Sequence, residues 1–160
     1  MIRLATKADF PVILKIYESA REFMRSQGNP NQWLNDRPKV ELLENDIENR
    51  RLYVLDDNGI YAVFACIIGR DPTYDVIEGG SWLSDSLYAT IHRIASDGTH
   101  AGVFHECSDF VYAITGHVRI DTHQDNKPMQ QAILREGYSY RGIIYVDAPV
   151  TPQRLAYEKI

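Results

Sequence analysis

The chain has 160 residues, of which 44% are hydrophobic and 24% charged, and its net charge is −5. This length predicts one domain over residues 1–160, and the acidic balance argues against nucleic acids and anionic membranes as partners. No apolar run approaches the roughly 18 residues of a membrane span. Two distant cysteines, Cys66 and Cys107, stand in apolar runs and predict buried, reduced thiols. Reduced thiols, with an N-terminus that resembles no signal or transit peptide, favour a cytoplasmic protein.

The first half of the chain predicts two helices and three strands. They are a strand at 2–5, a helix from Thr6 to Gly28, a second helix opening at Asp36, and strands at 51–56 and 60–69. Thr6 followed by Asp9 is typical of a helix start, because each can accept a hydrogen bond from the free N–H groups there. Asn58 and Gly59 supply the positive φ angles that a tight hairpin turn needs.

The second half alternates strands and helices. It predicts a loop at 70–86, a strand at 88–95, a helix at 101–114, a strand at 117–122, a helix opening at 125–128, and strands at 138–146 and 154–159. The order β-α-α-β-β-β-α-β-α-β-β combines hairpins with one parallel strand–helix–strand crossover. This order is typical of an α/β fold with a mixed central sheet and helices on both of its faces.

The segment "SDGTHAG" (96–102) leads from a predicted strand into a predicted helix. A helix N-terminus offers free N–H groups and partial positive charge, which suits a phosphate, although the two glycines also fit a plain turn. The chain has neither a Walker motif nor GxGxxG, which argues against a Walker-type nucleotidase and a Rossmann dinucleotide site.

Three segments carry a resemblance to a known family. "IRLATKADFPVILKIYESA", "TIHRIASDGTHAGVF" and "VRIDTHQDNKPMQQAILREGYSYRGIIYV" resemble GNAT-type N-acetyltransferases, and within them a subgroup of small bacterial members. The resemblance covers essentially the whole chain and implies the GNAT fold and acetyl-coenzyme A as cofactor. In that family, the strand before the loop binds the pantetheine arm and the loop binds the pyrophosphate. The residues implied to bind coenzyme A are Ile94, Ala95, Ser96, Thr99, His100, Ala101, Gly102, Val103, Phe104 and Asn126.

Two catalytic positions of the family are not matched, since its usual Tyr falls on Ile133 and its usual Glu falls near Ala89. Candidate bases are therefore Glu78, His92 and His123, for which the alternatives are a solvated carboxylate and hydrogen-bonded core histidines. Trp33, Tyr74 and Trp82 are expected to form either a wall of the acceptor pocket or a minor loop core. The histidines lack metal-binding spacing, so no metal is expected.

The resemblance implies transfer of an acetyl group to a primary amine of a small molecule or peptide, by direct attack in a ternary complex. It also allows a homodimer. One alternative is a non-catalytic protein that binds or senses acyl-coenzyme A. Another is a protein of this fold in which Phe104 blocks the loop and prevents coenzyme A from binding.

Overall fold

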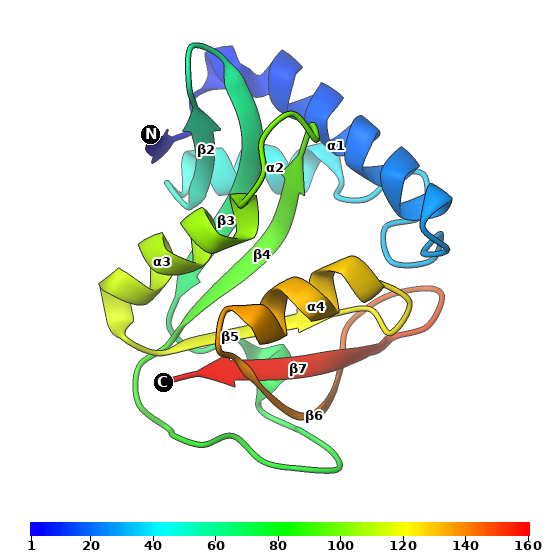
Figure 1. Ribbon diagram of the computed structural model, residues 1–160, viewed down its shortest axis with the longest axis vertical. Helices are drawn as coiled ribbons and strands as arrows, with labels where there is room; N and C mark the ends of the chain where they lie inside the picture. Colours follow the sequence, from blue (N-terminus) through cyan, green and yellow to red (C-terminus); the bar gives the residue numbers. More distant parts are fainter.

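A computed structural model describes all of residues 1–160 as one seven-stranded sheet with helices on both faces (Figure 1). The elements are β1 (Ile2–Leu4), α1 (Phe10–Ser26), α2 (Val40–Glu48), β2 (Leu52–Asp56), β3 (Ile60–Ile68), β4 (Ala89–Ser96), α3 (Val103–Thr115), β5 (Val118–Thr122), α4 (Lys127–Arg135), β6 (Ser139–Tyr145) and β7 (Gln153–Lys159). The strand order is β1-β2-β3-β4-β5-β7-β6, and only β4 and β5 pair in parallel. The predicted element order and mixed sheet are confirmed.

Local sequence signals account for most of the boundaries. Thr6 and Asp9 form the expected capping box before α1, and Asn58 and Gly59 have φ angles of 55° and 144° in the β2–β3 turn. The second helix begins at Val40, so the predicted start at Asp36 is wrong. Pro38 disfavours a helical conformation in the residue before it, which delays the helix until the proline has been passed.

The two faces of the sheet have separate cores. Helices α1 and α2 cover β2 and β3 with a cluster that includes Ile13, Tyr17 and Leu43, while α3 and α4 cover the other face. Both cysteines lie in the core, as predicted, and burial raises the pKa of the Cys66 thiol to about 11. No helix combines the length and the apolar character that crossing a bilayer requires.

The loop at 69–88 covers the β5–β7–β6 part of the sheet on the face opposite α4 and forms a third core with β6 and β7. The Arg119 guanidinium is stacked between the rings of Trp82 and Tyr88, at 4.2 and 4.1 Å from their centroids. Glu158, which is buried, accepts hydrogen bonds from Arg119 and from the backbone N–H of Leu83. These contacts fix the loop on the sheet.

Strands β4 and β5 start side by side and then diverge (Figure 1). They pair only at Ala89–Val118 and Thr90–Arg119. β4 also contains a bulge. Val63 and Ala65 are two positions apart on β3, but their partners on β4, Ala95 and His92, are three positions apart. A bulge bends a strand and interrupts its hydrogen bonding, so the end of β4 separates from β5 and its backbone becomes available to a ligand.

A buried carboxylate holds the bulge in place. Arg93 has a φ of 54°, which is uncommon for a residue other than glycine. Its guanidinium donates to the fully buried carboxylate of Asp46 at 2.8 and 3.0 Å, and its carbonyl oxygen accepts from the Tyr17 hydroxyl at 2.6 Å. Asp46 also accepts from Arg51 at 2.7 Å. Helices α1 and α2 thus impose the backbone conformation of β4.

Candidate functional site

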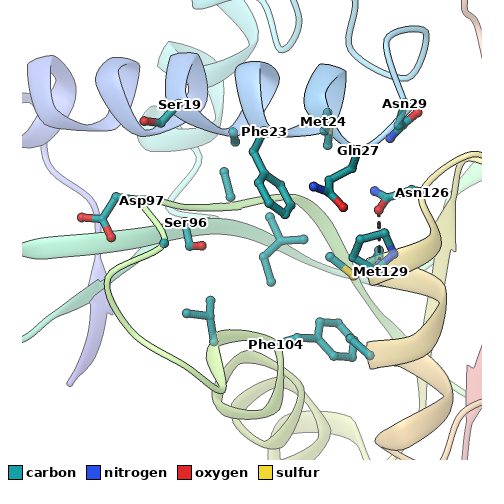
Figure 2. A pocket seen from close by; sticks show the side chains of 17 residues that line it. Ser19, Phe23, Met24, Gln27, Asn29, Ser96, Asp97, Phe104, Asn126 and Met129 are labelled. Carbon is teal, nitrogen blue, oxygen red and sulfur yellow. Dashed lines mark hydrogen bonds between the residues drawn. The ribbon is translucent and has the colours of Figure 1, made fainter.

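A cavity of about 320 Å³ lies where β4 and β5 diverge (Figure 2). Its walls come from the second half of α1, the end of β4, and the first turns of α3 and α4. Phe23 points into it from α1, and Met129 faces it from α4 (Figure 2). Ile94, Ala95 and Ser96 form the wall that β4 contributes, as expected for a ligand that runs along this strand.

Phe104 lies on the α3 side of this cavity and does not fill it. Its side chain is 8% exposed and packs against Tyr138, with ring centroids 6.0 Å apart. Side chains in a helix lean toward its N-terminus and onto the neighbouring turn, which here carries the ring into the core below α3. The alternative in which Phe104 blocks the loop is therefore not what the structure shows.

The first turn of α3 presents free hydrogen-bond donors. Gly102 precedes the helix with a φ of 74°, and the backbone N–H groups of Val103, Phe104 and His105 have no acceptor within the protein. These donors add to the partial positive charge of a 13-residue helix, so the turn suits an anionic group.

Three residues expected to bind coenzyme A do not line the cavity: Thr99, His100 and Ala101. Thr99 donates its hydroxyl hydrogen to the Asp97 carboxylate at 2.6 Å, and the His100 ring stacks on Tyr61 at 3.7 Å between centroids. The preceding residues of the loop, Asp97 and Gly98, face the cavity instead.

Asn126 caps α4 and links it to the segment that follows α1. Its side-chain oxygen accepts from the Met129 N–H at 3.2 Å, and its amide nitrogen donates to Gln32 at 2.9 Å. Asn126 lies on the wall of the first cavity and also on that of a second cavity, of about 140 Å³. Met24, Ile94 and Met129 also line both cavities. The two cavities therefore meet where β4 leaves β5.

The second cavity has a more polar wall. Its side chains include those of Trp33, His92, Asp121 and Arg154. The Nε2 atom of His92 lies 3.0 Å from a carboxylate oxygen of Asp71. Burial would raise the pKa of Asp71, but hydrogen bonds from His92 and Thr73 outweigh it and lower that pKa to about 2. An ionised carboxylate only accepts hydrogen bonds, so Nε2 of His92 is the donor, and Nδ1 is the nitrogen that has a free lone pair in the neutral ring.

Tyr74 and Trp82 do not line the second cavity but belong to the core below the loop, whereas Trp33 does line it. The Tyr74 hydroxyl donates to Asp121 at 2.6 Å, and the Trp82 indole donates to the Tyr74 carbonyl at 2.8 Å. Burial, and then the charge of Asp121, raise the pKa of Tyr74 well above its usual range. The phenol therefore stays protonated and orients the Asp121 carboxylate.

Glu78 and His123 lie outside both cavities. Glu78 is exposed beside β6 and accepts a hydrogen bond from the Tyr145 hydroxyl at 2.9 Å. His123 is 1% exposed, and its Nδ1 accepts from the N–H of Asp125 at 3.0 Å. Of the three candidate bases, only His92 lines one of these two cavities. Its partner Asp71, and the charged residues Asp121 and Arg154, were not anticipated.

Ile133 and Ala89 are both fully buried in the core under α3 and α4, so neither position faces a ligand. One group of side chains is close enough together to hold a metal ion. It consists of His105 and Asp109 on the surface of α3 and Glu136 at the end of α4. His105 is already paired with Glu136 at 2.9 Å and with Asp109 at 3.4 Å, and none of the three lines either cavity.

The same fold occurs in a crystal structure of a GNAT-family acetyltransferase from Streptococcus agalactiae. The two sequences are 31% identical, the TM-score is 0.89, and the match covers 100% of this chain and 94% of the other. The chain belongs to the GNAT family of acetyltransferases. No protein-family model and no curated protein matches it.

More distant solved structures share the fold alone. An acetyltransferase of the family from Listeria monocytogenes is 16% identical, with a TM-score of 0.71 over 99% of this chain and 93% of its own. Naa50 of Arabidopsis thaliana, solved in complex with the bisubstrate analogue CoA-Ac-MVNAL, is 7% identical, with a TM-score of 0.64 over 100% of this chain and 97% of its own.

Proposed function

We propose that this GNAT protein transfers an acetyl group from acetyl-CoA to a primary amine by direct attack in a ternary complex. The observation that carries the proposal is that two cavities of different character meet at Ile94, Asn126 and Met129. Direct transfer requires two substrates to be held with their reacting atoms in contact, and adjoining cavities provide such an arrangement.

The larger cavity suits coenzyme A. Its volume lies at the lower end of the range for ligand pockets, roughly 300–1,000 Å³. The apolar walls around Phe23 and Met129 fit a pantetheine arm, β4 offers backbone groups beyond its bulge, and the N–H groups of Val103 and Phe104 fit the pyrophosphate. Naa50, which has the same fold, was solved with a coenzyme A conjugate, which supports the assignment.

The smaller cavity suits the amine and the base that deprotonates it. Bound acetyl-CoA supplies a thioester, whose carbonyl carbon gains a bond to nitrogen as the carbon–sulfur bond breaks and its electron pair leaves with sulfur. The proton that nitrogen loses is accepted by Nδ1 of His92, while Asp71 holds the ring and stabilises its charge. We assign the thioester carbonyl oxygen to the backbone N–H groups near Ile94 and Ala95, which line the larger cavity. The thiolate leaves without an acid at Ile133, since a coenzyme A thiolate is already a tolerable leaving group.

Binding of the cofactor is tested by calorimetric titration with acetyl-CoA. The protein should bind one equivalent, and Met129→Trp should weaken binding at least tenfold by filling the junction of the two cavities. Leu134→Trp is the matched control, because Leu134 is 53% exposed on the same helix and outside both cavities. Absence of binding at millimolar acetyl-CoA would overturn the proposal.

Turnover is tested by following thiol release with a panel of primary amines. His92→Gln should lower kcat/KM by about 10²- to 10⁴-fold, the usual contribution of a general base, and leave acetyl-CoA affinity unchanged. His105→Gln, which alters an exposed histidine side chain outside both cavities, should have no effect on turnover. If the protein binds acetyl-CoA but none of the amines leads to thiol release, it is the non-catalytic binding protein that the sequence left open.

A further inference from the structure

Arg154 is a buried guanidinium without an acidic partner. It lies on β7 at 5% exposure, and it lines the smaller cavity. Its hydrogen bonds come from Nη1 alone, which donates to the carbonyl oxygens of Thr151 at 2.6 Å and Gln153 at 2.9 Å. Burial lowers the pKa of Arg154, and the nearby charge of Asp121 only partly offsets this effect. Buried charges are normally paired, so a guanidinium with unused donors beside a cavity indicates a ligand that pairs with it.

Asp121 lies on the same wall with the opposite charge. It pairs with Ala156 across β5 and β7, so Arg154 is its diagonal neighbour on the same face, at roughly 7–8 Å between Cα atoms. The two side chains do not form an ion pair with each other, since the recorded hydrogen bond of Asp121 comes from the Tyr74 hydroxyl. The wall thus offers a site for a cation and a site for an anion on neighbouring strands.

We infer that the acceptor is a small amino acid-like amine, whose carboxylate pairs with Arg154 while its amino group lies beside Asp121 and His92. This inference rests on the proposed function and names the substrate class of the same site. A carboxylate would satisfy the free guanidinium donors with bidentate, charge-assisted hydrogen bonds. The ammonium form of the amine would be attracted by Asp121 and would lose one proton to solvent before attack, and the second proton, which nitrogen loses on forming the amide, would pass to His92.

The size of the cavity agrees with a small acceptor. A volume of about 140 Å³ holds some four or five waters at about 30 Å³ each, which fits a short amino acid but not a segment of folded protein. Trp33, at the edge of the same wall, packs edge-on against Tyr17 with centroids 5.6 Å apart and is therefore held in position. A rigid wall of this kind restricts the length of the acceptor side chain.

The test compares amines that differ only in the carboxylate, with thiol release from acetyl-CoA as the readout. Amino acids such as alanine and β-alanine are each paired with the corresponding amide and with the amine lacking the carboxyl group. The best amino acid should exceed its amide in kcat/KM by about a hundredfold, because the amide leaves the buried charge unpaired. Equal rates for the acid and its amide would overturn the inference but leave the proposed function intact. No thiol release with any amine would mean that the proposed function itself had failed.

Variants show whether Arg154 causes the preference. Arg154→Gln should reduce the acid-to-amide ratio to near one, mainly by raising KM for the acid, while acetyl-CoA binding stays unchanged. Arg154→Lys should restore part of the ratio. Arg141→Gln is the matched control, since Arg141 on β6 lies outside both cavities and donates to the Ser81 carbonyl. A loss of folding would lower both rates together, so only a change in the ratio supports the inference, and an unchanged ratio in Arg154→Gln would refute it.

Discussion

Replacing Asp46 with alanine should destabilise the protein and loosen the bulge in β4. The Asp46 carboxylate is fully buried and accepts three hydrogen bonds from two guanidinium groups. Removing one partner from a buried charge cluster costs about 3–5 kcal/mol. The side chains of Arg51 and Arg93 are 30% and 17% exposed, so water can partly solvate them once the carboxylate is lost. We therefore expect the lower end of the range, about 3 kcal/mol.

The assay is thermal unfolding followed by circular dichroism. For a chain of this size, about 3 kcal/mol corresponds to a decrease in Tm of roughly 6–12 °C. Asp36→Ala is the control, because Asp36 is 67% exposed and 3.9 Å from Arg37, and such surface pairs contribute at most about 1 kcal/mol. A decrease for Asp46→Ala no larger than that of the control would refute the reasoning.

The same variant tests the link between the charge cluster and the cofactor. The left-handed conformation of Arg93 persists only where its surroundings enforce it. Without Asp46, the strand should return toward regular geometry, and the affinity for acetyl-CoA should fall about tenfold. Unchanged affinity in a destabilised variant would show that the Tyr17 hydrogen bond alone maintains the bulge.

Three further changes follow from the structure. Burial lowers the pKa of His123, so below about pH 6.5 this residue binds more protons in the unfolded chain than in the folded one. Tm should therefore fall as the pH decreases from about 6.5. His123→Asn should flatten this part of the curve of Tm against pH. A Cβ at Gly80 would lie 1.9 Å from the Arg141 carbonyl oxygen, so Gly80→Ala should lower the free energy of unfolding by about 1–3 kcal/mol in urea titrations. Glu158→Gln removes a buried acceptor from His117, and limited proteolysis should then cut the loop at 69–88 faster, whereas equal rates would contradict its role.

The sequence predicted the elements because their signals are local. The Thr6–Asp9 box, the Asn58–Gly59 turn and the Asn126 cap each depend on residues within four positions of one another, and periodicity identified the buried faces of the helices. The predicted start of α2 at Asp36 is wrong because Pro38 disfavours a helical conformation in the residue before it, an effect that the apolar pattern after Val40 does not reveal.

The residues of the proposed acceptor site were less predictable because they meet only in the folded chain. Asp71 and His92 are 21 residues apart in sequence, and their hydrogen bond depends on the path of the long loop after β3. Arg154 follows a proline-containing loop and has no motif of its own. An arginine with a positive φ also contradicts the strand pattern around it, so the bulge at Arg93 has no signal in the sequence. Functional sites are expected to break local rules in this way.

The sparse pairing of β4 with β5 has a consequence for how long the protein survives. Only two residue pairs join β4 to β5, so the N-terminal and C-terminal parts of the sheet are weakly connected there. A ligand in the larger cavity would contact β4 on one side and α4 on the other. Occupancy should therefore slow local opening and amide exchange at this junction. Acetyl-CoA at a hundred times its Kd would add about 2.7 kcal/mol to the free energy of unfolding. The protein should then resist proteolysis best when acetyl-CoA is abundant, so its lifetime would follow the metabolic supply of its own substrate.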